Sequence, residues 1–94
     1  MTGAAVPGPA SDPGSDEIGE TVLRLAAARG AASSICPSEV ARALRPDDWR
    51  PLMGRVRKVA VDLARQNRLQ VLRKGKPAEL DALRGVIRLR IVSD

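Results

Sequence analysis

The sequence predicts an α+β fold, a winged helix-turn-helix domain in which three helices precede a small antiparallel β-hairpin, the wing. Three observations lead to this prediction. Segments with helical periodicity come first, and two segments with alternating apolar residues follow them. The stretch 35–68 (ICPSEVARALRPDDWRPLMGRVRKVAVDLARQNR) combines a short capped helix, a tight acidic connection and a longer helix. The order helix, short strand, helix, helix, strand, strand is that of this fold.

Length and charge predict one cationic domain behind a tail. Residues 1–14 hold too few large apolar side chains to offset their ordering entropy, so we expect a disordered tail there and the folded domain over residues 15–94. Residues 1–20 carry four acidic and no basic residues, whereas residues 21–94 carry 16 basic and 7 acidic residues, a formal charge of +9. Such a domain usually meets a polyanion, and the alternative is a soluble basic protein without one.

The first helix is expected to begin with Ser15 as its N-cap and to end at Gly30. Acidic residues in its first turn suit the positive end of the helix dipole. Ile18 and Val22, four residues apart, belong to its apolar side. Residues 33–36 are short and partly β-branched, and we expect a few residues of strand there that pair with the later hairpin.

The next two helices are expected to form the helix-turn-helix. The first of them should begin at Pro37, with Cys36 as N-cap and Glu39 at the third position. A proline then breaks it, and Asp47 is expected to cap a third helix over residues 48–67. The third helix has an apolar stripe roughly 120° wide, which we expect to face the core and which consists of Trp49, Leu52, Met53, Val56, Val59, Ala60 and Leu63.

The C-terminal third is expected to form the wing. Residues 69–74 and 86–92 alternate apolar and polar side chains, as half-buried strands do. The sequence Lys-Gly-Lys-Pro at 74–77 is typical of a turn, and residues 79–84 are compatible with one helical turn. In the last strand we expect Ile87, Leu89 and Ile91 to face the core.

The strings ICPSEVARAL, PDDWR, VRKVAVDLARQNRLQVLRKG and RGVIRLR together resemble a family of short bacterial proteins of unassigned function with a winged-helix fold. The resemblance covers nearly all of residues 18–90. It implies the fold and no activity. In winged helices generally the helix at residues 48–67 is the recognition element, and Pro51 in its first turn departs from that pattern.

The cationic side of the third helix predicts binding of double-stranded DNA, with transcriptional regulation as the role. An α-helix fits the major groove, where arginine pairs with guanine, and lysine neutralises phosphates. Val61 on the same side is suited to a thymine methyl group, and the lysines of the turn are suited to phosphates. The predicted nucleic-acid-binding residues are Arg50, Arg55, Arg57, Lys58, Val61, Arg65, Lys74 and Lys76.

Two alternatives remain open for this surface. In the first, the charged side chains are solvated and bind nothing. In the second, the domain binds protein instead of DNA, and Val61, Gly54 and the alanine-rich first helix contact a protein partner or form a homodimer. RNA is disfavoured, because single-stranded bases usually stack on aromatic rings and Trp49 is the only aromatic residue.

Composition disfavours catalysis and metal binding. The sequence has no histidine, and its single cysteine, Cys36, allows neither an internal disulfide nor a structural zinc site. We therefore expect no enzymatic activity, metal or cofactor. Cys36 at a helix N-terminus is a candidate redox-sensitive thiol, and the alternative is a small buried hydrophobe. No apolar run reaches the roughly 20 residues of a membrane span, and a signal peptide is lacking, so we expect a cytoplasmic protein.

Overall fold

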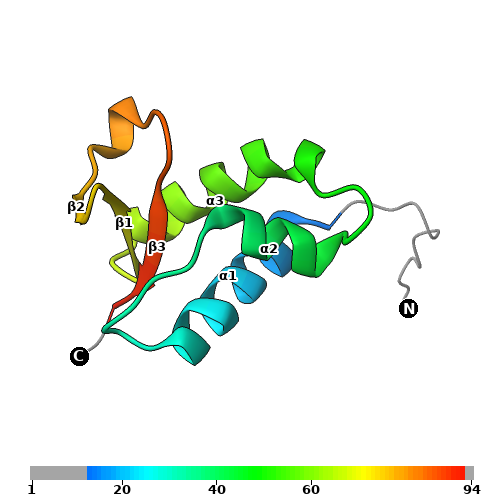
Figure 1. Cartoon of the computed structure of the whole chain (residues 1–94), viewed down its shortest axis with the longest axis horizontal. Helices are drawn as coiled ribbons and strands as arrows, with labels where there is room; N and C mark the ends of the chain where they lie inside the picture. Colours follow the sequence, from blue (N-terminus) through cyan, green and yellow to red (C-terminus); the bar gives the residue numbers. More distant parts are fainter. Residues whose placement is uncertain (1–12, 93–94) are drawn as a thin grey trace.

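The computed structural model describes residues 13–92, in which three α-helices lie against a small three-stranded antiparallel sheet (Figure 1). The elements are α1 (Ser15–Arg29), α2 (Pro37–Leu44), the 3-10 turn η1 (Arg50–Leu52), α3 (Met53–Arg65), β1 (Leu69–Arg73), β2 (Lys76–Pro77), the 3-10 turn η2 (Leu80–Ala82) and β3 (Arg88–Ile91). This arrangement confirms the predicted α+β class and is compatible with a winged helix-turn-helix. A disordered tail was predicted for residues 1–14, and residues 1–12 of it lie outside the described residues.

Helix α1 crosses the molecule beside α2 and α3 and buries one side against them (Figure 1). Its buried side carries Ile18, Val22 and Ala26, each at most 1% exposed. The prediction that Ser15 caps this helix is wrong. The carbonyl of Gly14 accepts the first helical bond from the Ile18 N–H at 2.9 Å, so Gly14 is the N-cap and Ser15 is already inside the helix.

Helix α2 begins as predicted, with Pro37 at its first position and a capping box formed with Glu39. A carboxylate oxygen of Glu39 accepts the backbone N–H of Cys36 at 2.9 Å, which satisfies one donor that the helix leaves unpaired. Eight residues are too few for a stable isolated helix, so α2 depends on the burial of Val40 and Ala41, both 0% exposed.

The third helix begins later than predicted, and Asp47 does not cap it. Pro51 has no N–H to donate, so the first bond available is that from the Leu52 N–H to the Trp49 carbonyl at 2.9 Å, which makes a 3-10 turn. Regular α-helix starts only at Met53. At the other end Asn67 has a φ of 63°, and the helix closes with a bond from the Arg68 N–H to the Leu63 carbonyl at 3.0 Å.

The sheet has the strand order β2-β1-β3, so β1 is central. Arg73 pairs with Lys76 across a two-residue loop, and both loop residues, Lys74 and Gly75, have positive φ (55° and 81°). Positive φ at both positions defines the type I′ turn that suits a tight hairpin, and glycine meets that demand without strain. The short strand predicted at residues 33–36 is reduced to one residue, Ile35, which bridges β3.

One apolar core joins the helices to the sheet. The predicted stripe of α3 is buried from Leu52 to Leu63 except at Met53, which is half-buried, and Ile87 and Leu89 enter the core from the C-terminal side. Trp49, however, was placed in the core by periodicity and is only half-buried at its edge. Because Trp49 precedes η1, helical spacing does not determine the direction of its side chain.

Candidate nucleic-acid interface

The side of η1 and α3 that points away from the core carries five of the eight residues predicted to bind DNA. Helical spacing puts the four that belong to α3 opposite the buried positions Val56, Val59 and Leu63, and Arg50 precedes them in η1. Three of the five are exposed, whereas Arg57 and Val61 are half-buried. This surface, called here the α3 outer face, consists of Arg50, Arg57, Lys58, Val61 and Arg65.

Arg55 does not belong to the α3 outer face. Its guanidinium turns toward the start of α1, where Nη1 donates to the carbonyl of Pro13 at 3.2 Å. Arg55 therefore ties α3 to the residue before the Gly14 cap, and this contact gives it a structural role.

The loop between β2 and β3, residues 78–87, is held against the α3 outer face by two arginines. Arg57 donates from Nη1 to the carbonyl of Gly85 at 3.1 Å, and Arg65 forms an ion pair with Asp81 at 2.6 Å between Nη2 and Oδ1. The loop thus flanks the α3 outer face. Figure 1 shows this loop, with η2, rising from the sheet end of α3.

The ion pairs on this surface are solvent-exposed and therefore weak. The Arg65 and Asp81 side chains are 53% and 87% exposed, and Lys58 meets Asp62 at 3.6 Å with 77% and 52% exposed. Exposed pairs of this kind are worth about 0–1 kcal/mol. Their cations can exchange the carboxylate for another anion at little cost.

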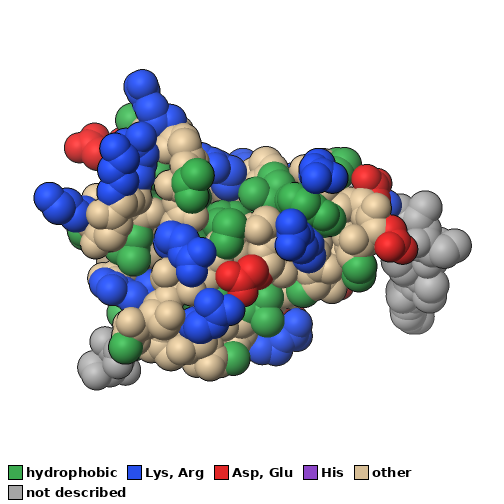
Figure 2. Space-filling view, viewed as in Figure 1, with side chains coloured by type: hydrophobic (Ala, Val, Ile, Leu, Met, Phe, Trp, Pro, Cys, Tyr) green, Lys and Arg blue, Asp and Glu red, His purple; other side chains and the backbone are tan. Residues whose placement is uncertain are grey.

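The two predicted lysines of the wing stand at the tip of the β1–β2 hairpin. Lys74 lies in the turn, Lys76 follows it, and both are exposed. The strand residue before the turn, Arg73, is also exposed and approaches Gly85 of the loop. Because Arg57 contacts the same glycine, Arg73 brings the base of the hairpin close to the α3 outer face. Figure 2 shows Lys and Arg side chains gathered over this sheet end of the molecule.

Sequence reasoning missed two arginines that the fold adds to this region. Arg42 of α2 lies over the Trp49 ring, 4.5 Å from its centroid, and Arg50 lies 4.7 Å from the same centroid. An arginine stacked on an aromatic ring keeps its in-plane donors free. Arg73 is the other missed residue. In the sequence it appears only as the last residue of a strand, and nothing local links it to Arg57.

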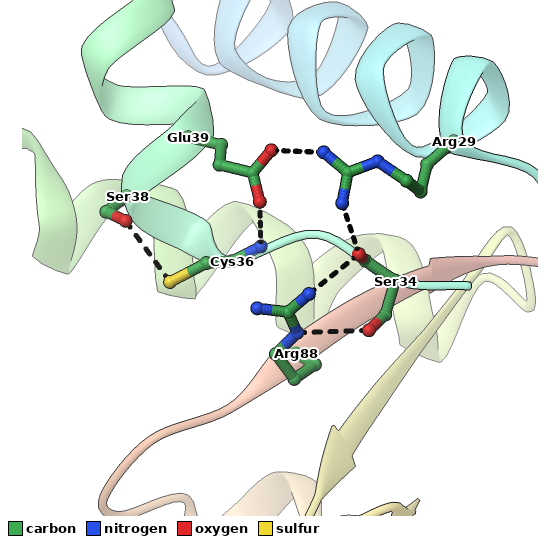
Figure 3. Close-up of polar contacts among 6 residues, drawn as sticks. All are labelled: Arg29, Ser34, Cys36, Ser38, Glu39 and Arg88. Atoms are coloured by element: carbon green, nitrogen blue, oxygen red, sulfur yellow. Dashed lines mark hydrogen bonds and ion pairs between the residues drawn. The ribbon is translucent and has the colours of Figure 1, made fainter.

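Cys36, the predicted redox-sensitive residue, lies in a polar cluster at the start of α2 (Figure 3). Its thiol is half-buried, and Sγ accepts a hydrogen bond from Oγ of Ser38 at 3.2 Å. Arg29 and Arg88 both donate to the carbonyl of Ser34, at 2.8 and 2.9 Å. These contacts join α1, α2 and β3, so the cluster has a structural role.

The carboxylate of Glu39 is the acidic centre of the same cluster. The hydrogen bond from the Cys36 backbone lowers the pKa of Glu39 below its ordinary value of 4.5. The hydrogen bond and positive charge of Arg29 lower it further, and partial burial opposes both effects. The 2.6 Å contact with Arg29 is an exposed ion pair.

Within residues 13–92, no three His, Cys, Asp or Glu side chains come together as a metal site would require. None of the helices in that range has the length and apolar character needed to cross a membrane.

Residues 15–92 match a family described as "Protein of unknown function (DUF3253)". The chain belongs to the DUF3253 family. The match runs from the first residue of α1 to just beyond β3, so the DUF3253 domain includes both the α3 outer face and the β2–β3 loop. The resemblance to a family of unassigned function is thereby confirmed. No curated protein matches the chain.

Proposed function

We propose that this protein binds double-stranded DNA, with the α3 outer face in the major groove and the β1–β2 hairpin on the backbone. One observation carries the proposal: Arg57 of the α3 outer face and Arg73 at the base of the β1–β2 hairpin both approach Gly85, so these two cationic elements meet at one place. An exposed helix with arginines suits base edges, and the hairpin lysines suit phosphates. The role is that of a non-catalytic, cytoplasmic regulator of transcription.

On binding DNA, cations of the α3 outer face would exchange their weakly bound carboxylate partners for phosphate groups. Lys58 and Arg65 leave exposed carboxylates, and the cost of each exchange is small because those pairs are screened by water. Arg50, stacked on Trp49, is already oriented and loses little side-chain freedom on binding. If about five phosphates are neutralised, the slope of log affinity against log salt should be near −4.5.

Fluorescence anisotropy of a labelled random duplex at two salt concentrations tests the proposal. The double variant Arg50→Ala/Lys58→Ala should bind at least tenfold more weakly than the wild type. The matched control is Arg24→Glu, which changes the net charge by the same amount on the outer side of α1. Equal loss in both variants would mean that only total charge matters, and no binding by the wild type at low salt would refute the proposal.

A second candidate is docking of a protein, either another protein or a second copy of this chain. The observation that favours it is Val86, which is 78% exposed in the β2–β3 loop next to the Arg57 contact. Light scattering of the wild type and of Val86→Ser, without nucleic acid, tests this candidate. A dimer that the substitution abolishes would support docking, and a wild-type monomer would exclude the second copy.

A further inference from the structure

Two arginines, one on α3 and one on β1, converge on Gly85 in the β2–β3 loop. Arg57 of α3 donates to the Gly85 carbonyl at 3.1 Å. On the β1 side, a methyl group on Gly85 would lie 3.5 Å from both Nε and Nη2 of Arg73. A third cation, Arg84, immediately precedes the glycine and is exposed.

The convergence leaves positive charge without a matching carboxylate. In the described part of the chain, no ion pair joins Arg57 or Arg73 to an acidic side chain. Asp81 in the same loop is paired with Arg65, and Glu79 lines a hollow of about 230 Å³ with Arg73 without pairing to it. Like charges held together repel, and a bound anion relieves that repulsion.

The backbone of Gly85 makes the convergence possible. Its φ is +73°, a conformation that side-chain-bearing residues rarely adopt, and it turns the carbonyl toward Arg57. A methyl group at this position would make only ordinary van der Waals contact with the Arg73 guanidinium, so the positive φ and not a lack of space favours glycine. Arg57 uses one of its five N–H donors here, and the others remain for a ligand.

We propose that Arg57, Arg73 and the Gly85 turn form a binding site for a single phosphate group. The inference rests on the proposed function in one respect: the phosphate is assigned to a DNA strand that passes over the surface where α3 meets the β2–β3 loop. Guanidinium groups bind phosphate oxygens through paired hydrogen bonds, and two of them on one phosphate fix the position of the strand. Substitution of Arg73 tests this phosphate site separately from the α3 outer face, because Arg73 does not belong to that face.

The first experiment compares Arg73→Ala with Arg24→Ala in anisotropy titrations of a labelled random duplex across a range of salt concentrations. Both variants lose one exposed positive charge and should melt like the wild type. We expect Arg73→Ala to reduce the magnitude of the log–log salt slope by about 0.9 and to weaken binding several-fold. We expect Arg24→Ala to keep the wild-type slope.

The second experiment titrates inorganic phosphate into the wild type and both variants and follows the backbone amide resonances of Gly85 and Val86. A saturable shift that disappears in Arg73→Ala and persists in Arg24→Ala supports the site. If that shift is present while no duplex binds, the DNA proposal falls and the phosphate belongs to a small molecule. If duplex binds while Arg73→Ala keeps the wild-type slope and phosphate shifts nothing, the site is refuted and DNA binding stands.

Discussion

The Glu39 carboxylate offers a test of how the helices are joined to the sheet. In Glu39→Ala the capping bond to the Cys36 N–H is lost, which costs about 1 kcal/mol. The ion pair with Arg29 is exposed, so its loss adds only about 0.5 kcal/mol. A domain of this size loses about 4–8 °C of melting temperature per kcal/mol, so the total predicts a decrease of about 9 °C at pH 7.

Glu39→Gln separates the two contributions. The amide oxygen can still accept the Cys36 N–H, so this variant should lose only the part that depends on charge, about 0.5 kcal/mol. Because the pKa of Glu39 is lowered on folding, its ionic stabilisation is present above its ordinary pKa of 4.5 and is lost as the pH falls through the folded-state pKa. The gap between wild type and Glu39→Gln should therefore close in acid.

Thermal unfolding followed by circular dichroism between pH 7 and pH 3 measures these differences. The control is Glu79→Ala, which removes an exposed carboxylate that has no partner among the described residues and should leave the melting temperature unchanged. The reasoning would be refuted if Glu39→Gln were as unstable as Glu39→Ala at pH 7. A gap between wild type and Glu39→Gln that stayed constant down to pH 3 would refute it equally.

Two further predictions concern packing and the thiol. Leu52→Ala should lower the free energy of unfolding by about 2–5 kcal/mol, because Leu52 is 0% exposed. Trp49→Ala should lower it by only about 2 kcal/mol, because the ring is half-buried and stacked by two guanidinium groups. Denaturant unfolding measures both values, and a larger loss for Trp49→Ala would place the ring in the core after all. The half-buried Cys36 thiol should react with iodoacetamide at neutral pH much more slowly than in denaturant, and equal rates by mass spectrometry would show it to be freely accessible.

Sequence reasoning succeeded where the determining interactions are local. The capping box of α2 lies within four residues, so Pro37 and Glu39 revealed it directly. The turn at Lys74 and Gly75 was equally visible from composition. Reasoning from periodicity failed at Trp49, since the periodicity was extended through Pro51 to a residue that is not helical.

The candidate site was only partly predictable for the same reason. Helical spacing identified the part of the α3 outer face that lies on α3, because one helix sets those positions. The partners of Arg57 and Arg65 depend on the path of the β2–β3 loop, and the approach of Arg73 to Gly85 depends on two strands and a loop at once. Such relations arise only when segments distant in sequence meet, so no local pattern encodes them.

The bridge between Ile35 and Leu89 has a consequence for synthesis of the protein. Two hydrogen bonds of 2.8 Å join these residues, which are both 0% exposed and lie more than fifty positions apart. A nascent chain that has emerged only as far as Gly85 lacks Ile87 and Leu89, so its three helices and the β1–β2 hairpin have an incomplete core. Folding of this domain therefore waits for its last strand, and until then chaperones would meet exposed apolar surface on α1 and α3.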